Sequence, residues 1–235
     1  MSNIIEINSL IKAFDNKTII DDISFCVPKN GLFGIIGLNG AGKTTTIKCM
    51  LNLIPEYSGD ILINGKNAKH ASSRKIVSYL PERFSPNVNI TGYEYIKTYC
   101  EIYSTKFNKK QTDYFADELS LLPFLTQKIG KCSKGTVQKI GILACLLSET
   151  PIIVMDEPTS GLDVIARRKL KATLIKAGAN KTILFTSHIM QDVADLANNI
   201  VVMAHSQVIF EGNPQDFKDK YLTQNFEEAF IASLS

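Results

Sequence analysis

Short runs of consecutive hydrophobic residues are the clearest pattern along the chain. The runs at 32–36, 152–155 and 182–185 do not alternate with polar residues, which is typical of strands buried on both faces of a parallel sheet. Each of them ends abruptly in glycine-rich or polar sequence. Further strands are expected at 4–7, 18–27, 61–63, 200–203 and 207–210, with turns at 15–17 and 64–65.

Helical patterns occupy much of the sequence between these strands. Helices are expected at 44–53 and 164–177, and most of 93–147 is expected to be helical, with breaks near Pro123 and at 130–135. The amphipathic tail after Pro214 is expected to form a helix as well. Because strands buried on both faces need helices to cover them, the pattern predicts an α/β core. An antiparallel N-terminal sheet and a helical insertion complete the predicted fold.

Composition and charge narrow the possible partners. The 26 Lys and Arg nearly balance the 23 Asp and Glu, which does not favour a nucleic-acid partner, and the basic run at 106–110 is interpreted as a solvated loop. Five scattered cysteines fit neither a disulfide framework nor a zinc site, so reduced thiols in the cytosol are expected. Without a signal peptide or an apolar run of about 18 residues, a membrane role would require a separate partner.

The sequence GLNGAGKT, from Gly37 to Thr44, matches the phosphate-binding pattern G-x-x-x-x-G-K-[ST]. Glycines let the backbone wrap around a phosphate, and the N-terminus of the following helix carries positive partial charge. Lys43 would neutralise phosphate charge, and the Thr44 hydroxyl would ligate Mg²⁺. The flanking strand and helix favour a nucleotide site over a glycine-rich turn without a ligand. The expected contacts are Gly37, Leu38, Asn39, Gly40, Ala41, Gly42, Lys43, Thr44 and Thr45.

Two carboxylates, Asp156 and Glu157, follow the apolar run at 152–155. In phosphate-loop ATPases the first such carboxylate holds Mg²⁺, and a second one beside it can orient or deprotonate the attacking water. Acidic residues after a strand also commonly cap a helix, which is the alternative interpretation. The phosphate loop earlier in the chain favours the catalytic interpretation.

Four further motifs follow in order: YLPE at 79–82, CSKGT at 132–136, PTSGLD at 158–163 and TSH at 186–188. With these motifs the chain resembles the ATP-binding subunit of ABC transporters over almost its whole length. They fall where that family has its Q-loop, signature motif, D-loop and switch histidine. The resemblance implies an α/β fold of the P-loop NTPase type, with a three-layer core, an N-terminal antiparallel β-subdomain and a helical insertion.

The resemblance also implies roles for single residues. Glu157 would be the general base, His188 would contact and sense the γ-phosphate, and Lys43 would complete the catalytic set. Phe14 lies where the family stacks an aromatic ring on adenine, although a buried core phenylalanine is the alternative. The ligands of Mg²⁺ would be Thr44, Glu82 and Asp156.

The resemblance also implies that a second subunit contributes to the site. Ser133 and Gly135 would contact the γ-phosphate bound to a second copy, because they open a helix expected at 136–147, whose N-terminus attracts an anion. Asp163 would lie at the same interface. The expected assembly is therefore a head-to-tail dimer in the ATP-bound state, with two ATP molecules at the interface between its subunits.

Two motifs depart from the family pattern. Glu82 replaces the Q-loop glutamine, and an ionised carboxylate cannot donate a hydrogen bond. The signature has CSKGT where Leu-Ser-Gly-Gly-Gln is common, so Ser133 and Gly135 are kept, while Thr136 replaces the glutamine and Lys134 adds charge. These features, together with the segments 89–94 and 225–230, resemble a branch of bacterial transporters with separate subunits, most of which are exporters.

The sequence therefore predicts one ABC ATPase domain over 1–235, with the core at 1–82 and 149–212, a helical subdomain at about 83–148 and a tail at 213–235. It is expected to hydrolyse ATP with Mg²⁺ at the cytoplasmic face of the membrane, bound to a separate transmembrane permease, with no nucleic acid. One alternative is a soluble ABC-type ATPase in cofactor assembly. Another is a non-catalytic nucleotide switch, which the altered signature suggests. The cargo cannot be predicted.

Overall fold

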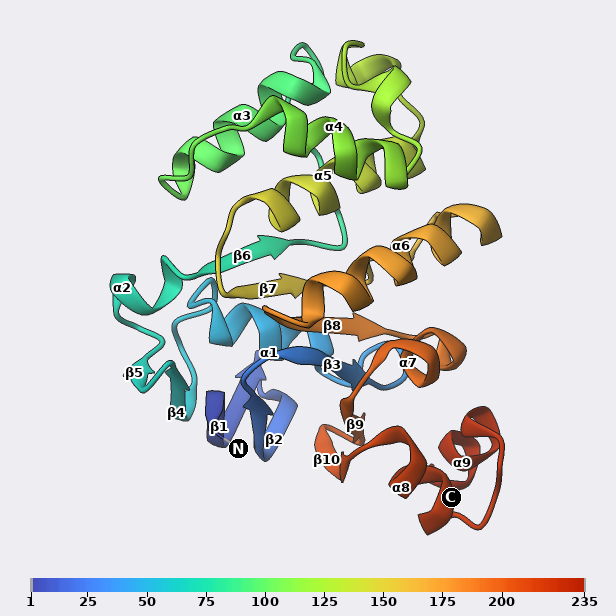
Figure 1. Cartoon of the computed structure of the whole chain (residues 1–235). Coiled ribbons are helices and arrows are strands. Elements are labelled where there is room, and N and C mark those ends of the chain that lie inside the picture. Colours follow the sequence, from blue (N-terminus) through green and yellow to red (C-terminus); the bar gives the residue numbers. More distant parts are fainter. Residues whose placement is uncertain (1, 235) are drawn as a thin grey trace.

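Two β-sheets and the helices around them form the fold in the computed structural model, which describes residues 2–234 (Figure 1). Most strands of the larger sheet come from the apolar runs of the sequence. In spatial order this sheet consists of β10 (Gln207–Gly212), β9 (Asn199–Ala204), β3 (Gly31–Ile36), β8 (Thr182–Ser187), β7 (Ile152–Met155) and β6 (Val77–Leu80).

Parallel pairing aligns one edge of the larger sheet. The strands β9, β3, β8, β7 and β6 are parallel, and β10 pairs antiparallel with β9. Ile36, the last residue of β3, lies opposite Ser187, the last residue of β8. Leu80 and Met155 end β6 and β7 in the same way. The loops that follow these four strands therefore leave the sheet at the same edge.

The smaller sheet is antiparallel, as expected. Its spatial order is β2 (Lys17–Pro28), β1 (Asn3–Phe14), β4 (Ser58–Ile63) and β5 (Lys66–Asn67). Its inward side chains share one hydrophobic cluster with α1 (Lys43–Met50) and with one face of the larger sheet. Along β3, Phe33 and Ile35 join this cluster, whereas Leu32 and Ile36 join a second cluster on the opposite face. This alternation puts the larger sheet in the middle of three layers.

Helices cover the second face of the larger sheet. In Figure 1 the helices α3, α4 and α5 lie at the top of the view, beyond β6 and β7, and α8 and α9 lie at the bottom near the C-terminus. Their hydrophobic side chains contribute to the second cluster. The bounds are α3 (Gly92–Ile102), α4 (Lys109–Glu118), α5 (Lys134–Leu147), α6 (Val164–Gly178), α7 (Met190–Leu196), α8 (Pro214–Lys220) and α9 (Phe226–Ala232), with the short α2 at Ala71–Arg74.

The structure confirms the α/β class and corrects several details. The helix expected at 44–53 is the shorter α1, and the helix expected to begin at Thr136 begins at Lys134. The expected breaks hold 3₁₀ turns at Leu122–Phe124 and Ile129–Lys131. β5, β6, α2 and α7 were not expected. The domain boundaries of the sequence analysis stay a prediction.

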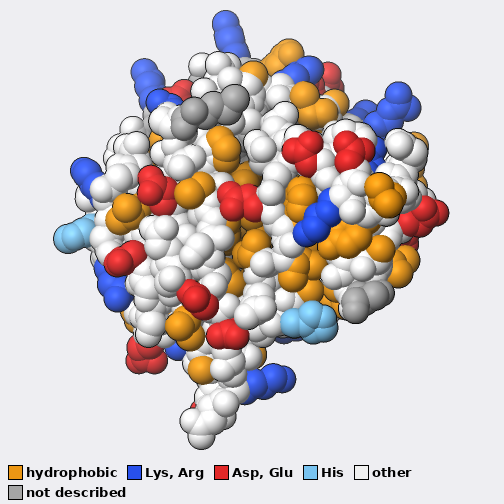
Figure 2. All heavy atoms as spheres, turned by 90° about the horizontal axis from the view of Figure 1, so that it is seen from below, with side chains coloured by type: hydrophobic (Ala, Val, Ile, Leu, Met, Phe, Trp, Pro, Cys, Tyr) orange, Lys and Arg blue, Asp and Glu red, His pale blue; other side chains and the backbone are white. Residues whose placement is uncertain are grey.

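Two surface properties bear on the possible partners. Figure 2 shows acidic, basic and hydrophobic side chains interspersed on the face seen from below. Within residues 2–234, every helix is too short or too polar to cross a membrane.

Candidate nucleotide site

Most of the predicted site residues follow the carboxyl ends of adjacent parallel strands. The glycine-rich loop follows β3, Asp156 and Glu157 follow β7, and His188 follows β8. Glu82 comes shortly after β6, where the backbone N–H of Asp156 donates to the carbonyl of Leu80 at 2.8 Å. In open α/β sheets, ligands bind in the crevice outside these carboxyl ends. The topology alone therefore brings together residues that lie as far apart in the sequence as Gly37 and His188.

A cavity of about 450 Å³ opens at this edge of the sheet. Predicted residues from five separate segments line it, together with Ile19, which was not predicted. Gly37, Leu38 and Asp156 do not line the cavity, although Leu38 and Asp156 directly precede lining residues in the sequence. The lining residues are Phe14, Ile19, Asn39, Gly40, Ala41, Gly42, Lys43, Thr44, Thr45, Glu82, Glu157 and His188.

Two glycines of the loop are required by geometry. A Cβ atom on Gly37 would lie 2.4 Å from the carbonyl oxygen of Met203 in β9, so no larger residue fits there without a shift. Gly42 precedes α1 with a φ of 101°, a left-handed conformation that L side chains rarely adopt. Its carbonyl accepts from the Thr46 hydroxyl at 3.0 Å. The loop is thus packed tightly against the sheet while Asn39 and Gly40 stay exposed.

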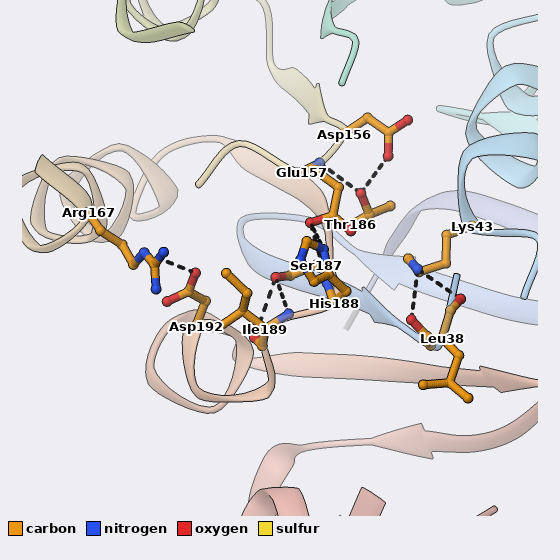
Figure 3. Close-up of polar contacts among 11 residues, drawn as sticks. Leu38, Lys43, Asp156, Glu157, Arg167, Thr186, Ser187, His188, Ile189 and Asp192 are labelled. Carbon is orange, nitrogen blue, oxygen red and sulfur yellow. Dashed lines mark hydrogen bonds and ion pairs between the residues drawn. The ribbon is translucent and has the colours of Figure 1, made fainter. Parts of the chain in front are cut away.

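Lys43 is a buried cation held by the loop itself. Its side chain is only 7% exposed, and its Nζ donates to the carbonyls of Gly37 at 2.7 Å and Leu38 at 3.2 Å (Figure 3). Burial lowers the pKa of this ammonium, and the carboxylates of Glu157, Asp156 and Glu82 oppose that shift. Because its partners are neutral carbonyls, the ammonium can exchange them for phosphate oxygens, to which it binds more strongly.

Thr186 joins the two acidic residues. This threonine in β8 is fully buried; its hydroxyl donates to Oδ1 of Asp156 at 2.6 Å and accepts from the backbone N–H of Glu157 at 2.9 Å (Figure 3). The other carboxylate oxygen of Asp156, Oδ2, is buried and has no hydrogen-bond partner within residues 2–234. A buried carboxylate oxygen without a donor fits a cation, and carboxylate and hydroxyl oxygens are ligands that Mg²⁺ prefers.

Glu157 is held in an unusual conformation. Its φ of 53° lies in the left-handed region, which costs a non-glycine residue roughly 1–3 kcal/mol and is concentrated at functional sites. Its side chain is 7% exposed, and Oε2 lies 2.8 Å from Nδ1 of His188 and 3.3 Å from the backbone N–H of His188. Since an ionised carboxylate only accepts, the contact places a proton on Nδ1 of the histidine. The imidazole itself is 49% exposed at the mouth of the cavity.

Three predicted residues lie apart from this cavity. Ser133 is the N-cap of α5, accepting from the N–H of Thr136 at 3.2 Å, and Asp163 is the N-cap of α6, accepting from the N–H of Ala166 at 2.8 Å. Gly135 packs against the loop before α6, where an added Cβ would lie 3.1 Å from the Gly161 carbonyl. A single chain therefore does not bring Ser133, Gly135 and Asp163 to its own phosphate loop.

Comparison with known proteins decides the family. The family model described as ABC transporter matches residues 20–160, more than half of the chain. This chain belongs to the ABC transporter family. It is the ATP-binding subunit, and ATP-binding domains of this family hydrolyse ATP.

Several proteins are similar to this ABC subunit. An uncharacterized ABC transporter ATP-binding protein of Methanocaldococcus jannaschii is 30% identical over 90% of this chain and 78% of its own. A probable multidrug ABC transporter ATP-binding protein of Escherichia coli is 28% identical; the match spans 97% of this chain but 41% of that protein. A solved structure titled as the ATP binding subunit of an ABC transporter has a TM-score of 0.87 at 25% identity, covering 98% of this chain and 99% of the other.

The structure adds detail that the sequence motifs of the ABC subunit did not supply. Phe14 is 43% exposed and lines the cavity, so the alternative of a buried core residue is wrong. The bridging role of Thr186 was missed, although a hydroxyl directly after the apolar run at 182–185, beside the strand that Asp156 follows, could have indicated it.

Proposed function

We propose that this ABC subunit hydrolyses ATP to drive export through a separate membrane subunit, and that it acts as a dimer at the cytoplasmic face of the membrane. One observation carries the catalytic part of the proposal. Thr186 links Asp156 to the backbone of Glu157, and the Glu157 carboxylate contacts His188, so the three residues form one hydrogen-bonded unit that lies next to the phosphate loop.

The residues of the cavity divide the reaction between them. The N–H groups of the loop and the ammonium of Lys43 bind the phosphates, while Phe14 stacks on adenine. Glu157 accepts a proton from the attacking water, and His188 holds that carboxylate through Nδ1. If His188 also donates to the γ-phosphate through Nε2, the ring is an imidazolium, because a neutral imidazole carries one proton. His188 then senses the phosphate and orients the base at once.

A magnesium ion fits the residues behind the loop. Asp156 supplies the buried Oδ2 without a partner, Thr44 supplies a hydroxyl, and Glu82 supplies a carboxylate at the cavity wall. No cluster of three or more acidic, His or Cys residues that could hold a metal alone occurs in the described part of the chain. That agrees with Mg²⁺, which is bound through one or two carboxylates plus phosphate oxygens and water. When bound, Mg²⁺ neutralises charge on the phosphates.

A second copy supplies the residues that one chain leaves apart. Ser133 and Gly135 begin α5, and helix N-termini bind anions. Ser133 is exposed and Gly135 half-buried, so another subunit's γ-phosphate can approach them. Asp163, exposed at the start of α6, lies at the same interface in this proposal.

The permease is proposed to dock near residues 82–103. A second cavity of about 650 Å³ lies in this region, between the segment from Glu82 to Val88 and the start of α5. Cysteines introduced at exposed positions such as Arg83 should crosslink the membrane subunit in the purified complex. Crosslinks only from other surfaces, such as α8, would contradict this docking site. The name of the Escherichia coli relative, a probable multidrug protein, supports export as the direction.

Turnover tests the catalytic claim against the two alternatives. Mg²⁺-dependent ATP hydrolysis by the wild type should be lost in Glu157→Gln and kept in Glu101→Gln, which changes an exposed carboxylate on α3. A wild type as inactive as Glu157→Gln would favour the non-catalytic switch. An active protein that never co-purifies with a membrane subunit would favour the ATPase of cofactor assembly.

A further inference from the structure

Lys12 is a buried lysine at the base end of the cavity. Lys12 is only 6% exposed and lies in β1, the strand that ends at Phe14. Its Nζ donates to the backbone carbonyl of Glu56 at 2.5 Å and lies 4.6 Å from the centroid of the Phe14 ring. Both partners are uncharged, although a buried ammonium is costly unless it is well satisfied. The sequence motifs assign no role to this residue.

The ammonium covers one face of the Phe14 ring. The pairing of β1 with β2 is irregular between Lys12 and Ala13, and the Lys12 ammonium lies over the Phe14 ring two residues further along the strand. Phe14 lines the nucleotide cavity and Lys12 does not. A ligand in the cavity therefore cannot reach the face beneath Lys12, and the opposite, exposed face is left for stacking.

The same lysine is anchored to a segment outside the phosphate loop. Glu56 lies in the segment that leads from α1 to β4, and α1 begins at the phosphate loop. Its carbonyl thus ties Lys12 to the segment after the C-terminal end of α1, whereas the phosphate loop precedes the N-terminal end of that helix. The cation–π contact ties Lys12 to the ring. A cation over an aromatic ring contributes more when it is desolvated, as here.

We propose that Lys12 is a positioning residue for nucleotide binding: it fixes the Phe14 ring as a platform on which the base stacks. The inference rests on the proposed function, in which Phe14 contacts adenine. Fixing the ring in advance removes part of the entropic cost of ordering it when the base binds. Lys12 therefore favours ligands that carry a base and leaves binding of the phosphates alone unchanged.

Calorimetric titrations with ATP and with inorganic tripolyphosphate, which lacks a base, separate these effects. Lys12→Met should weaken ATP binding about three- to tenfold, while tripolyphosphate binding changes by less than about twofold. Lys12→Gln keeps a donor for the Glu56 carbonyl but loses the charge, and it should weaken ATP binding as Lys12→Met does. It replaces Lys12→Met in the test if Lys12→Met does not fold. Lys17→Met removes an equal charge from the exposed cross-strand neighbour of Phe14 and should leave both affinities unchanged.

A double substitution completes the test. In a Phe14→Leu background, Lys12→Met should cause no further loss of ATP affinity, because the platform is already absent. Equal losses for ATP and tripolyphosphate, an unchanged ATP affinity, or an additive loss in the Phe14→Leu background would each overturn the proposal. A wild type that binds tripolyphosphate but shows no preference for ATP would also overturn it. A wild type that binds neither would instead contradict the proposed function.

Discussion

Replacing Thr186 by valine removes the hydroxyl that joins the two acidic residues of the site. The side chains have nearly the same shape, so the change tests hydrogen bonding rather than packing. Asp156 loses its only side-chain donor among the described residues, and the N–H of Glu157 is left without an acceptor in a buried position. The substitution should therefore affect both stability and turnover.

The expected cost follows from these two contacts. A hydrogen bond to a charged group contributes about 1.5–3 kcal/mol, and a buried unpaired N–H costs about 1–3 kcal/mol. The additional methyl group of valine returns about 0.8 kcal/mol through burial. The free energy of unfolding should fall by about 3 kcal/mol, which corresponds to a decrease in Tm of about 6–12 °C for a chain of this size.

Urea and thermal denaturation followed by far-UV circular dichroism would measure this loss. Thr186→Ser is the matched control, because it keeps the hydroxyl and loses one buried methyl group, at about 1 kcal/mol. ATP turnover should fall roughly tenfold or more in Thr186→Val, since the base is no longer held, and much less in Thr186→Ser. If Thr186→Val is as stable and as active as Thr186→Ser, the bridging role assigned to Thr186 is wrong.

Three further predictions concern other parts of the structure. Gly37→Ala places a Cβ against the carbonyl of Met203 and should abolish ATP binding in calorimetry; normal affinity would show that the loop can shift. Burial raises the pKa of the Cys49 thiol to about 11 and that of Cys145 to about 12, from 9.0. Since the folded state holds these protons more tightly than the unfolded chain, their contribution to stability is complete below pH 9 and is lost as the pH rises through 11 to 12. Tm should thus fall above pH 9, and less in Cys49→Ala; an equal fall in both proteins would exclude the thiol as a cause. Glu82→Gln keeps a side-chain oxygen that can ligate Mg²⁺ and adds a hydrogen-bond donor, so it should maintain or raise ATP turnover. A large decrease would show that the negative charge of Glu82 is needed.

The phosphate loop could be predicted from the sequence because its geometry is local. Its glycines, Lys43 and the helix that follows are all specified within a few residues. Asp156 and Glu157 were recognisable for a similar reason, since they follow an apolar strand directly. The parallel order of the strands then brings these segments together, and buried apolar runs indicate such an order.

Features that depend on pairing between distant segments could not be predicted. Thr186 bridges the carboxylates only because β8 lies beside β7, and Lys12 contacts Glu56 across 44 positions. β6 was missed because its four residues, Val-Ser-Tyr-Leu, include polar side chains and have no clear period. The start of α5 was placed two residues late because capping by Ser133 moves the first turn to Lys134.

Complementation between two inactive variants tests the central claim, a catalytic site shared by two chains, most directly. Lys43→Met disables the phosphate loop, and Ser133→Arg blocks the N-terminus of α5. In a mixed dimer, the intact loop of one chain would face the intact Ser133 of the other. Mixing the two variants should therefore restore ATP turnover to about a quarter of the wild-type rate, given random pairing and one intact site per mixed dimer. If the mixture stays as inactive as each variant alone, the shared site is contradicted.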